Sequence, residues 1–240
     1  MSAYLVCGCK PWNRRVFDEV ISKLPGEWFY AEDQRELDSW FVPDWLAAMG
    51  EGEDPPEWRY IFFLHWSWMV PPEIYEKYEC VNFHMTDLPY GRGGSPLQNL
   101  IEAGRRETRI TAHRMTGEVD CGPIYGLAGL GLHGTAEAVY VRATEMSAHL
   151  IDSIVANEPE PRPMRDPDDR DVRFTRRTPE QSVIPTDGTL DQLHDHIRML
   201  DAEGYPHAFI EYGNLRLEFR RAALYDGRVE ADVVITERAK

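Results

Sequence analysis

The sequence lacks any apolar run long enough to cross a membrane, and near the N-terminus its positive charges follow a short apolar stretch instead of preceding it. It is also short of positive charge: 26 Lys and Arg stand against 41 Asp and Glu, for a formal net charge of −15. A field of that sign disfavours binding to nucleic acid. These absences predict a cytoplasmic protein with no membrane and no nucleic-acid partner.

Cysteine is scarce as well, and the spacing of Cys7 and Cys9 is not the CxxC spacing of a redox or zinc motif. We therefore expect buried thiols and no disulfide framework. The turn after the first apolar segment, CGCKPWN, has one glycine, so the GxGxxG fingerprint of a dinucleotide site is missing there. No Ser or Cys lies in a nucleophile-elbow context, which disfavours covalent acyl transfer.

The 240 residues, 42% of them hydrophobic, suffice for a sizeable core. Apolar segments typical of strands alternate with amphipathic segments typical of helices, which predicts an α/β domain with a mostly parallel sheet. The expected strands are 3–9, 59–66, 78–84 and 108–115, and the expected helices are 13–24 with Asn13 as N-cap, 95–104, and 135–157.

Proline and charged residues dominate 161–187, which predicts a linker between a main domain at 1–160 and a small α+β subdomain at 188–240. About fifty residues are too few to fold alone, so the subdomain should pack on the main domain. Its expected elements are a helix at 189–200 with a capping box, a hairpin around Gly213-Asn214, and a last strand at 230–236.

Two polar residues end one predicted strand, at the edge of the sheet where ligands bind in parallel α/β folds. Asn82 and His84 are two apart, so their side chains point the same way. If strands 80–84 and 109–115 pair, Asp120 in the following loop comes near His84. An amide, an imidazole and a carboxylate can form a general-base site with an oxyanion stabiliser. A purely structural hydrogen-bonding role for His84 remains the alternative.

The stretch NFHMTDLPYGRGGSP at 82–96 resembles a pattern of the formyltransferase family that uses N10-formyltetrahydrofolate, roughly N-x-H-P-S-L-L-P-x-[YF]-R-G-x-x-P. VDCGPI at 119–124 resembles the L-D-x-G-x-I that follows it, and ETRITAHRM at 107–115 resembles the family's strand between the two. Departures are Met85, Thr86 and the order Tyr90-Gly91. The resemblance implies a Rossmann-like formyltransferase core at 1–160, with the small subdomain appended to it.

The resemblance also implies roles for the triad. His84 would take a proton from the attacking amine, Asn82 and His84 would stabilise the oxyanion, and Asp120 would orient the imidazole. N10-formyltetrahydrofolate would be the co-substrate, with no metal. Its pterin would lie in an apolar slot, for which the expected residues are Phe63, His65, Trp66, Trp68, Val119, Cys121 and Gly122.

The segment from 174 to 214 resembles sugar N-formyltransferases, which implies a nucleotide-linked amino sugar as acceptor, a role in polysaccharide biosynthesis, and a homodimer. A nucleotide diphosphate needs cations and an aromatic shelf for its base. The expected substrate-binding residues are Thr86, Arg92, Arg177, Arg198, Tyr205 and Phe209.

The sequence also allows two other functions. A metal-dependent hydrolase would use His84, Asp87 and Asp120 with His194 or His196 as ligands, although residues i and i+2 of a helix do not share a face. A folate-binding protein with this fold but without turnover would have no chemical need for all three triad groups.

Overall fold

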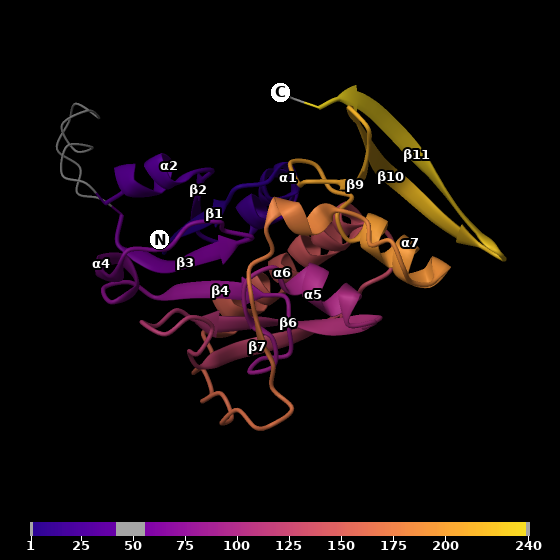
Figure 1. Ribbon diagram of the computed structural model, residues 1–240. Coiled ribbons are helices and arrows are strands. Elements are labelled where there is room, and N and C mark those ends of the chain that lie inside the picture. Colours follow the sequence, from indigo (N-terminus) through magenta and orange to yellow (C-terminus); the bar gives the residue numbers. More distant parts are fainter. Residues whose placement is uncertain (1, 42–55, 239–240) are drawn as a thin grey trace. The chain divides into compact units, whose positions relative to one another are not determined.

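The computed structural model describes residues 2–41 and 56–238 (Figure 1). Its larger sheet has the strand order β2-β1-β3-β4-β6-β7. The strands are β1 Ala3–Gly8, β2 Glu27–Ala31, β3 Trp58–Leu64, β4 Cys80–His84, β6 Glu107–Arg114 and β7 Ile124–Gly131.

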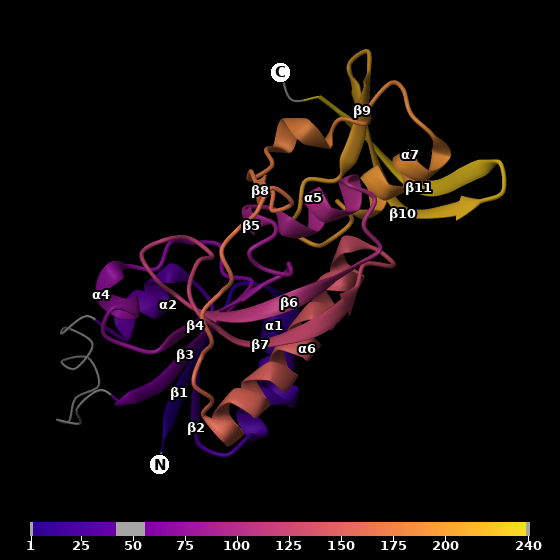
Figure 2. The same ribbon diagram turned by 90° about the horizontal axis from the view of Figure 1, so that it is seen from below.

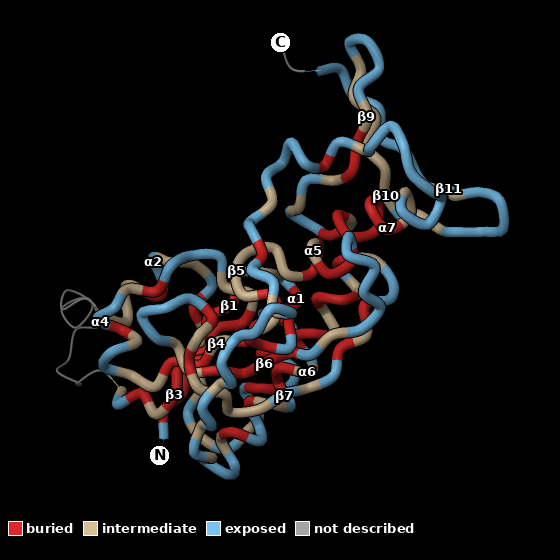
Figure 3. Tube along the Cα trace, turned by 60° about the horizontal axis from the view of Figure 1, so that its bottom comes forward, coloured by how far each residue is buried: buried red, intermediate tan, exposed pale blue. Residues whose placement is uncertain are grey.

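Parallel pairing dominates this sheet, as the alternation of strands and helices predicted. β1 pairs in parallel with β2 and β3, and β3 pairs in parallel with β4, whereas β6 runs antiparallel to β4. β1 is buried along its whole length and β3 along nearly all of its length (Figure 3). Continuous apolar runs are typical of such strands, because both of their faces are covered.

The helix after β1 is shorter than expected: α1 is Pro11–Glu19, and a separate 3-10 turn covers Ile21–Lys23. The predicted N-cap, Asn13, is wrong, because Lys10 occupies that position. Asn13 is fully buried, and its Nδ2 donates to Thr144 Oγ1 at 3.0 Å. This bond joins α1 to α6, Ala136–Asn157, which lies beside it (Figure 2). The short helices are α2 Gln34–Ser39, α4 Pro72–Tyr75 and α5 Pro96–Glu102.

The C-terminal elements follow the prediction. Helix α7, Leu190–Arg198, begins with the Thr189/Gln192 capping box. β9 and β10 form a hairpin that turns at 213–214, and β11 pairs with β10 in the antiparallel order β11-β10-β9. The bounds are β9 Ala208–Tyr212, β10 Leu215–Tyr225 and β11 Arg228–Glu237.

The contacts divide the chain into two units that are not continuous in sequence. Unit 1 comprises Met1–Arg92, Arg109–Gly129 and Val141–Val172, and unit 2 comprises Gly93–Thr108, Leu130–Tyr140 and Arg173–Lys240. The predicted boundaries at 160 and 187 followed composition along the chain, whereas this division follows contacts. The segment predicted as a linker holds the two-residue strand β8, Arg173–Phe174, which pairs with β5, Arg92–Gly93, and the 3-10 turn η2, Pro179–Ser182.

Candidate active site

β4 presents both polar residues of the predicted triad. Asn82 and His84 alternate with apolar residues, so they share one face of the strand. The neighbouring strand β6 is in register with them: Asn82 lies opposite His113, and His84 lies opposite Thr111. Paired residues of an antiparallel ladder point to the same side of the sheet. The pairing of β4 with β6 thus gathers polar side chains from two strands.

Asp120 reaches this group from the loop after β6. Its backbone has φ +54°, a left-handed conformation that Asp tolerates better than most residues. Its Oδ1 lies 3.6 Å from His84 Nδ1, 3.5 Å from Asn82 Nδ2 and 3.5 Å from His113 Nε2. The three predicted triad residues therefore meet around one carboxylate oxygen.

His84 is buried, and both of its ring nitrogens have neighbours. Nε2 lies 2.8 Å from the carbonyl oxygen of Gly91, and Nδ1 faces Asp120. Burial lowers the pKa of His84 from its ordinary value; Asp120 and the Gly91 carbonyl oppose this shift, and His113 adds to it. A neutral imidazole with an available lone pair is what a general base requires.

Sequence reasoning missed His113. Its ring is buried, its Nε2 lies 3.2 Å from Asn82 Nδ2, and its Nδ1 lies 2.9 Å from the carbonyl oxygen of Arg114. The available signal was the alternation of β6: residues 111 and 113 must share the face that Asn82 and His84 occupy once the two strands pair.

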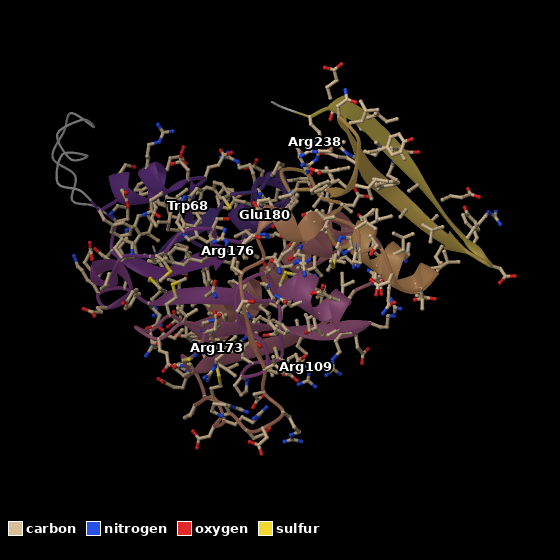
Figure 4. All side chains as sticks on the ribbon, viewed as in Figure 1. Trp68, Arg109, Arg173, Arg176, Glu180 and Arg238 are labelled. Carbon is tan, nitrogen blue, oxygen red and sulfur yellow. The ribbon has the colours of Figure 1, made fainter. Side chains whose placement is uncertain are left out.

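The residues predicted for the pterin slot fall into two groups. Phe63 is fully buried in β3 among core residues, so no part of its side chain is accessible to a ligand in this structure. Trp66 and Trp68 contact each other edge to face with ring centroids 4.9 Å apart, and Trp68 is 43% exposed. Trp68 is labelled in Figure 4. His65 follows β3 at φ +52°.

The other slot residues lie on the Asp120 loop. Val119 is exposed, and its carbonyl oxygen accepts a hydrogen bond from Cys121 Sγ at 3.1 Å. Gly122 is buried, and a Cβ at this position would lie 1.9 Å from the Arg114 carbonyl oxygen. Only glycine fits there, which ties the loop tightly to the end of β6.

Two predicted substrate-binding residues lie in unit 1. Thr86 is fully buried, and its Oγ1 has no hydrogen-bond partner among the described residues. Arg92 is half-buried, and its Nη2 donates to Met164 Sδ at 3.1 Å. A thioether is a weak acceptor without charge, so this contact does not neutralise the guanidinium of Arg92.

The other four lie in unit 2 and make contacts within it. Arg198 is 3% exposed and donates to Asp195 and to the carbonyl oxygens of Leu132 and Gly134, so it was wrongly predicted to bind substrate. Arg198 directly follows Ile197 of the apolar stripe of α7, and its side chain points into the interior of unit 2. Arg177 donates hydrogen bonds to the Glu102 carboxylate and to the Gln181 carbonyl oxygen. Tyr205 stacks on Tyr140, and Phe209 is buried with the Arg216 guanidinium over its ring.

No cluster of three His, Cys, Asp or Glu side chains within residues 2–41 and 56–238 is arranged to hold a metal ion. The grouping that the hydrolase alternative required is thus not found in that part of the chain. No helix there is long and apolar enough to span a membrane.

Fold and site together define an α/β protein in which a half-buried amide and a buried imidazole on β4 meet a buried carboxylate from the loop after β6. Comparisons with known proteins agree. The chain is 40% identical to a methionyl-tRNA formyltransferase from Clostridium thermocellum, covering 99% of this chain and 100% of that one, with a TM-score of 0.86. This protein belongs to the formyltransferase family that uses N10-formyltetrahydrofolate.

More distant matches point the same way. Residues 179–236 match the family described as methionyl-tRNA formyltransferase, C-terminal domain. A methionyl-tRNA formyltransferase from Rickettsia massiliae is 28% identical over 64% of this chain and 52% of its own, so this chain spans about half the length of the curated relatives it matches. A sugar N-formyltransferase from Shewanella shares the fold, with 16% identity, full coverage of both chains and a TM-score of 0.61.

Proposed function

We propose that this protein transfers a formyl group from N10-formyltetrahydrofolate to a primary amine. The observation that carries the proposal is the meeting of Asn82, His84 and Asp120 around a single carboxylate oxygen, with contacts of 3.5 to 3.6 Å. Nothing in the core packing of β4 requires two polar groups and a buried carboxylate at one point. Burying polar and charged groups costs free energy that hydrogen bonds only partly offset, and such costly groupings are typical of functional sites.

The folate would supply the formyl carbon, and Trp66, Trp68 and Val119 would offer apolar side chains to its flat pterin ring. As the amine nitrogen bonds to that carbon, the formyl oxygen gains negative charge, which the Asn82 N–H stabilises. The amine proton passes to His84 Nδ1, next to the Asp120 carboxylate. The bond from the carbon to N10 then breaks, and N10 takes up the proton that His84 releases, which leaves a formamide, tetrahydrofolate and a neutral His84.

For the acceptor we infer an amino sugar linked to a nucleoside diphosphate, as used in polysaccharide biosynthesis. The net charge of −15 repels a large polyanion, but a single arginine in a favourable place can hold a diphosphate. Arg92 is such a residue, because its neighbour Met164 does not neutralise it. It begins β5, a few residues after the triad strand β4.

A second acceptor, the amine of methionyl-tRNA, is favoured by the C-terminal family match and by the names of the relatives. A tRNA-binding protein needs a basic face to contact phosphates. Among these two acceptors, the charge balance of this chain favours the nucleotide sugar.

The test is release of tetrahydrofolate from N10-formyltetrahydrofolate with a panel of nucleotide-linked amino sugars and with methionyl-tRNA. We expect one sugar to be formylated and His84→Ala to lose at least about a hundredfold in kcat/KM, as for a missing general base. The exposed His149→Ala is the matched control and should keep full activity.

Formylation of methionyl-tRNA and of no sugar would show that the proposed acceptor is wrong and that the proposed formyl transfer is right. Tight folate binding without turnover of any acceptor would overturn the proposed activity and favour a folate-binding protein.

A further inference from the structure

The two site histidines face backbone carbonyl oxygens with opposite nitrogens. His113 places Nδ1 at 2.9 Å from the carbonyl oxygen of Arg114. A carbonyl oxygen can only accept a hydrogen bond, so Nδ1 must carry the proton. In the neutral ring Nε2 then has the lone pair, and it accepts from Asn82 Nδ2 at 3.2 Å.

His84 shows the reverse arrangement. Its Nε2 lies 2.8 Å from the Gly91 carbonyl oxygen, so Nε2 carries the proton and the lone pair is at Nδ1. That lone pair points toward Asp120 Oδ1, which is 3.6 Å away. The backbone carbonyl, and not the carboxylate, therefore fixes the orientation of the ring.

The Asn82 carboxamide is fixed as a consequence. Its nitrogen faces His113 Nε2 at 3.2 Å and Asp120 Oδ1 at 3.5 Å, and both of these atoms are acceptors. A flipped amide would place its oxygen against the lone pairs of both. The contact with His113 is the shorter one, so it anchors the amide, and the longer contact with Asp120 is the one that a formyl oxygen can replace.

We propose that the backbone holds His84 and His113 as opposite tautomers, and that His113, as the Nδ1–H form, is a positioning residue for the Asn82 amide. The positioning role of His113 in catalysis rests on the proposed function. The tautomer assignment does not rest on it, because it follows from the two carbonyl contacts alone.

Nitrogen NMR of protein labelled with ¹⁵N-histidine tests the tautomers without any turnover. The expected spectrum has one site histidine protonated at Nδ1 and the other at Nε2, assigned to His113 and His84 by the loss of each signal in His113→Gln and His84→Gln. Protonation of His113 at Nε2 in the neutral protein would overturn the proposal.

Kinetics test the positioning role. His113→Met fills the site without a strong acceptor, whereas His113→Gln offers an amide oxygen to Asn82. Because loss of an oxyanion donor costs about 10²- to 10³-fold in kcat, a misplaced donor should cost roughly ten- to a hundredfold. We expect that loss for Met, near wild-type kcat for Gln, and an unchanged KM for the folate in both.

An Asn82→Ala background separates this role from a structural one. If His113 acts through Asn82, His113→Met should cost little further activity there, since residues that act together are not additive. An equal loss with and without Asn82, or equal losses for Met and Gln in proteins with wild-type unfolding midpoints, would overturn the role. Inactivity of the wild type with every acceptor would instead refute the proposed function and leave the NMR result intact.

Discussion

His65 binds its proton at a different pH in the folded chain than in the unfolded chain. Burial of its ring and the nearby Lys10 lower its pKa from 6.5 to about 3. The unfolded chain takes up this proton as the pH falls through 6.5, and the folded chain does so only near 3. Stability is therefore complete above pH 6.5 and is lost progressively as the pH falls toward 3.

We predict that His65→Gln weakens this pH dependence. Between pH 7 and pH 5 the free energy of unfolding should fall by about 1 to 2 kcal/mol less in the variant than in the wild type. Urea unfolding at both pH values measures the difference. His149→Gln, at an exposed position, is the control, and an identical fall in wild type and His65→Gln would contradict the prediction.

At this scale the sequence was informative about the triad but not about its partners. The motif spacing indicated Asn82, His84 and Asp120, because the reacting groups stand at the same spacing in the family pattern that this stretch resembles. His113 and the Gly91 carbonyl were missed, since their roles depend on the register of β4 with β6 and on the path of a loop. Local sequence does not determine either.

Among the elements, the loop that carries Asp120 depends on Gly122. A Cβ there would lie 1.9 Å from the Arg114 carbonyl oxygen, which is backbone and cannot turn away. Gly122→Ala should therefore displace the loop and lower kcat by roughly a hundredfold, the scale of a misplacement near 1 Å.

Gly129→Ala in β7 is the matched control, because a Cβ there meets nothing within 4 Å. Steady-state kinetics measure kcat of both variants. Wild-type kcat in a folded Gly122→Ala protein would show that Asp120 does not need this loop geometry.

Arg198 connects helix α7 to the carbonyl oxygens of Leu132 and Gly134. The sequence suggested this residue as a substrate ligand. Its guanidinium is buried and bonds Asp195 at 2.6 Å and two carbonyl oxygens. Arg198→Met leaves these groups without their partner, so the free energy of unfolding should fall by about 3 kcal/mol. Denaturant unfolding measures this, with Arg35→Met, at an exposed arginine, as control. A stable variant with a raised KM for the acceptor would restore the substrate-binding interpretation.

Element types were predicted better than their ends. Apolar runs, apolar stripes and a capping box indicated β1, β3, β4, α6 and α7, because each of these sequence patterns favours one type of element. β2 and β7 were missed: EWFYA is short, and IYGLAGLG contains three glycines, which weaken a strand signal. These two strands form because the neighbouring strands of the sheet offer them hydrogen bonds.

At the scale of the whole molecule, the predicted homodimer has a candidate contact in β11. This strand is at the edge of its sheet and exposes Val233, Val234 and Ile235. Edge strands with exposed apolar residues tend to pair with another chain. In an antiparallel pair of two copies centred on Val234, Val233 opposes Ile235 and Glu230 opposes Arg238. Glu230 now pairs with Arg228 and Arg238 now pairs with Glu211, and both ion pairs are exposed, so they are weak enough to exchange.

Val234→Lys would place two like charges side by side on the axis of such a pair, and we predict that it abolishes self-association. Sedimentation velocity should give twice the chain mass of 27.7 kDa for the wild type and a single chain mass for the variant. Tyr212→Lys changes the most exposed aromatic residue of the opposite edge strand, β9, and should leave the dimer intact. If Tyr212→Lys dissociates the protein and Val234→Lys does not, the contact runs through β9, and a wild type that sediments as a single chain would remove the dimer altogether.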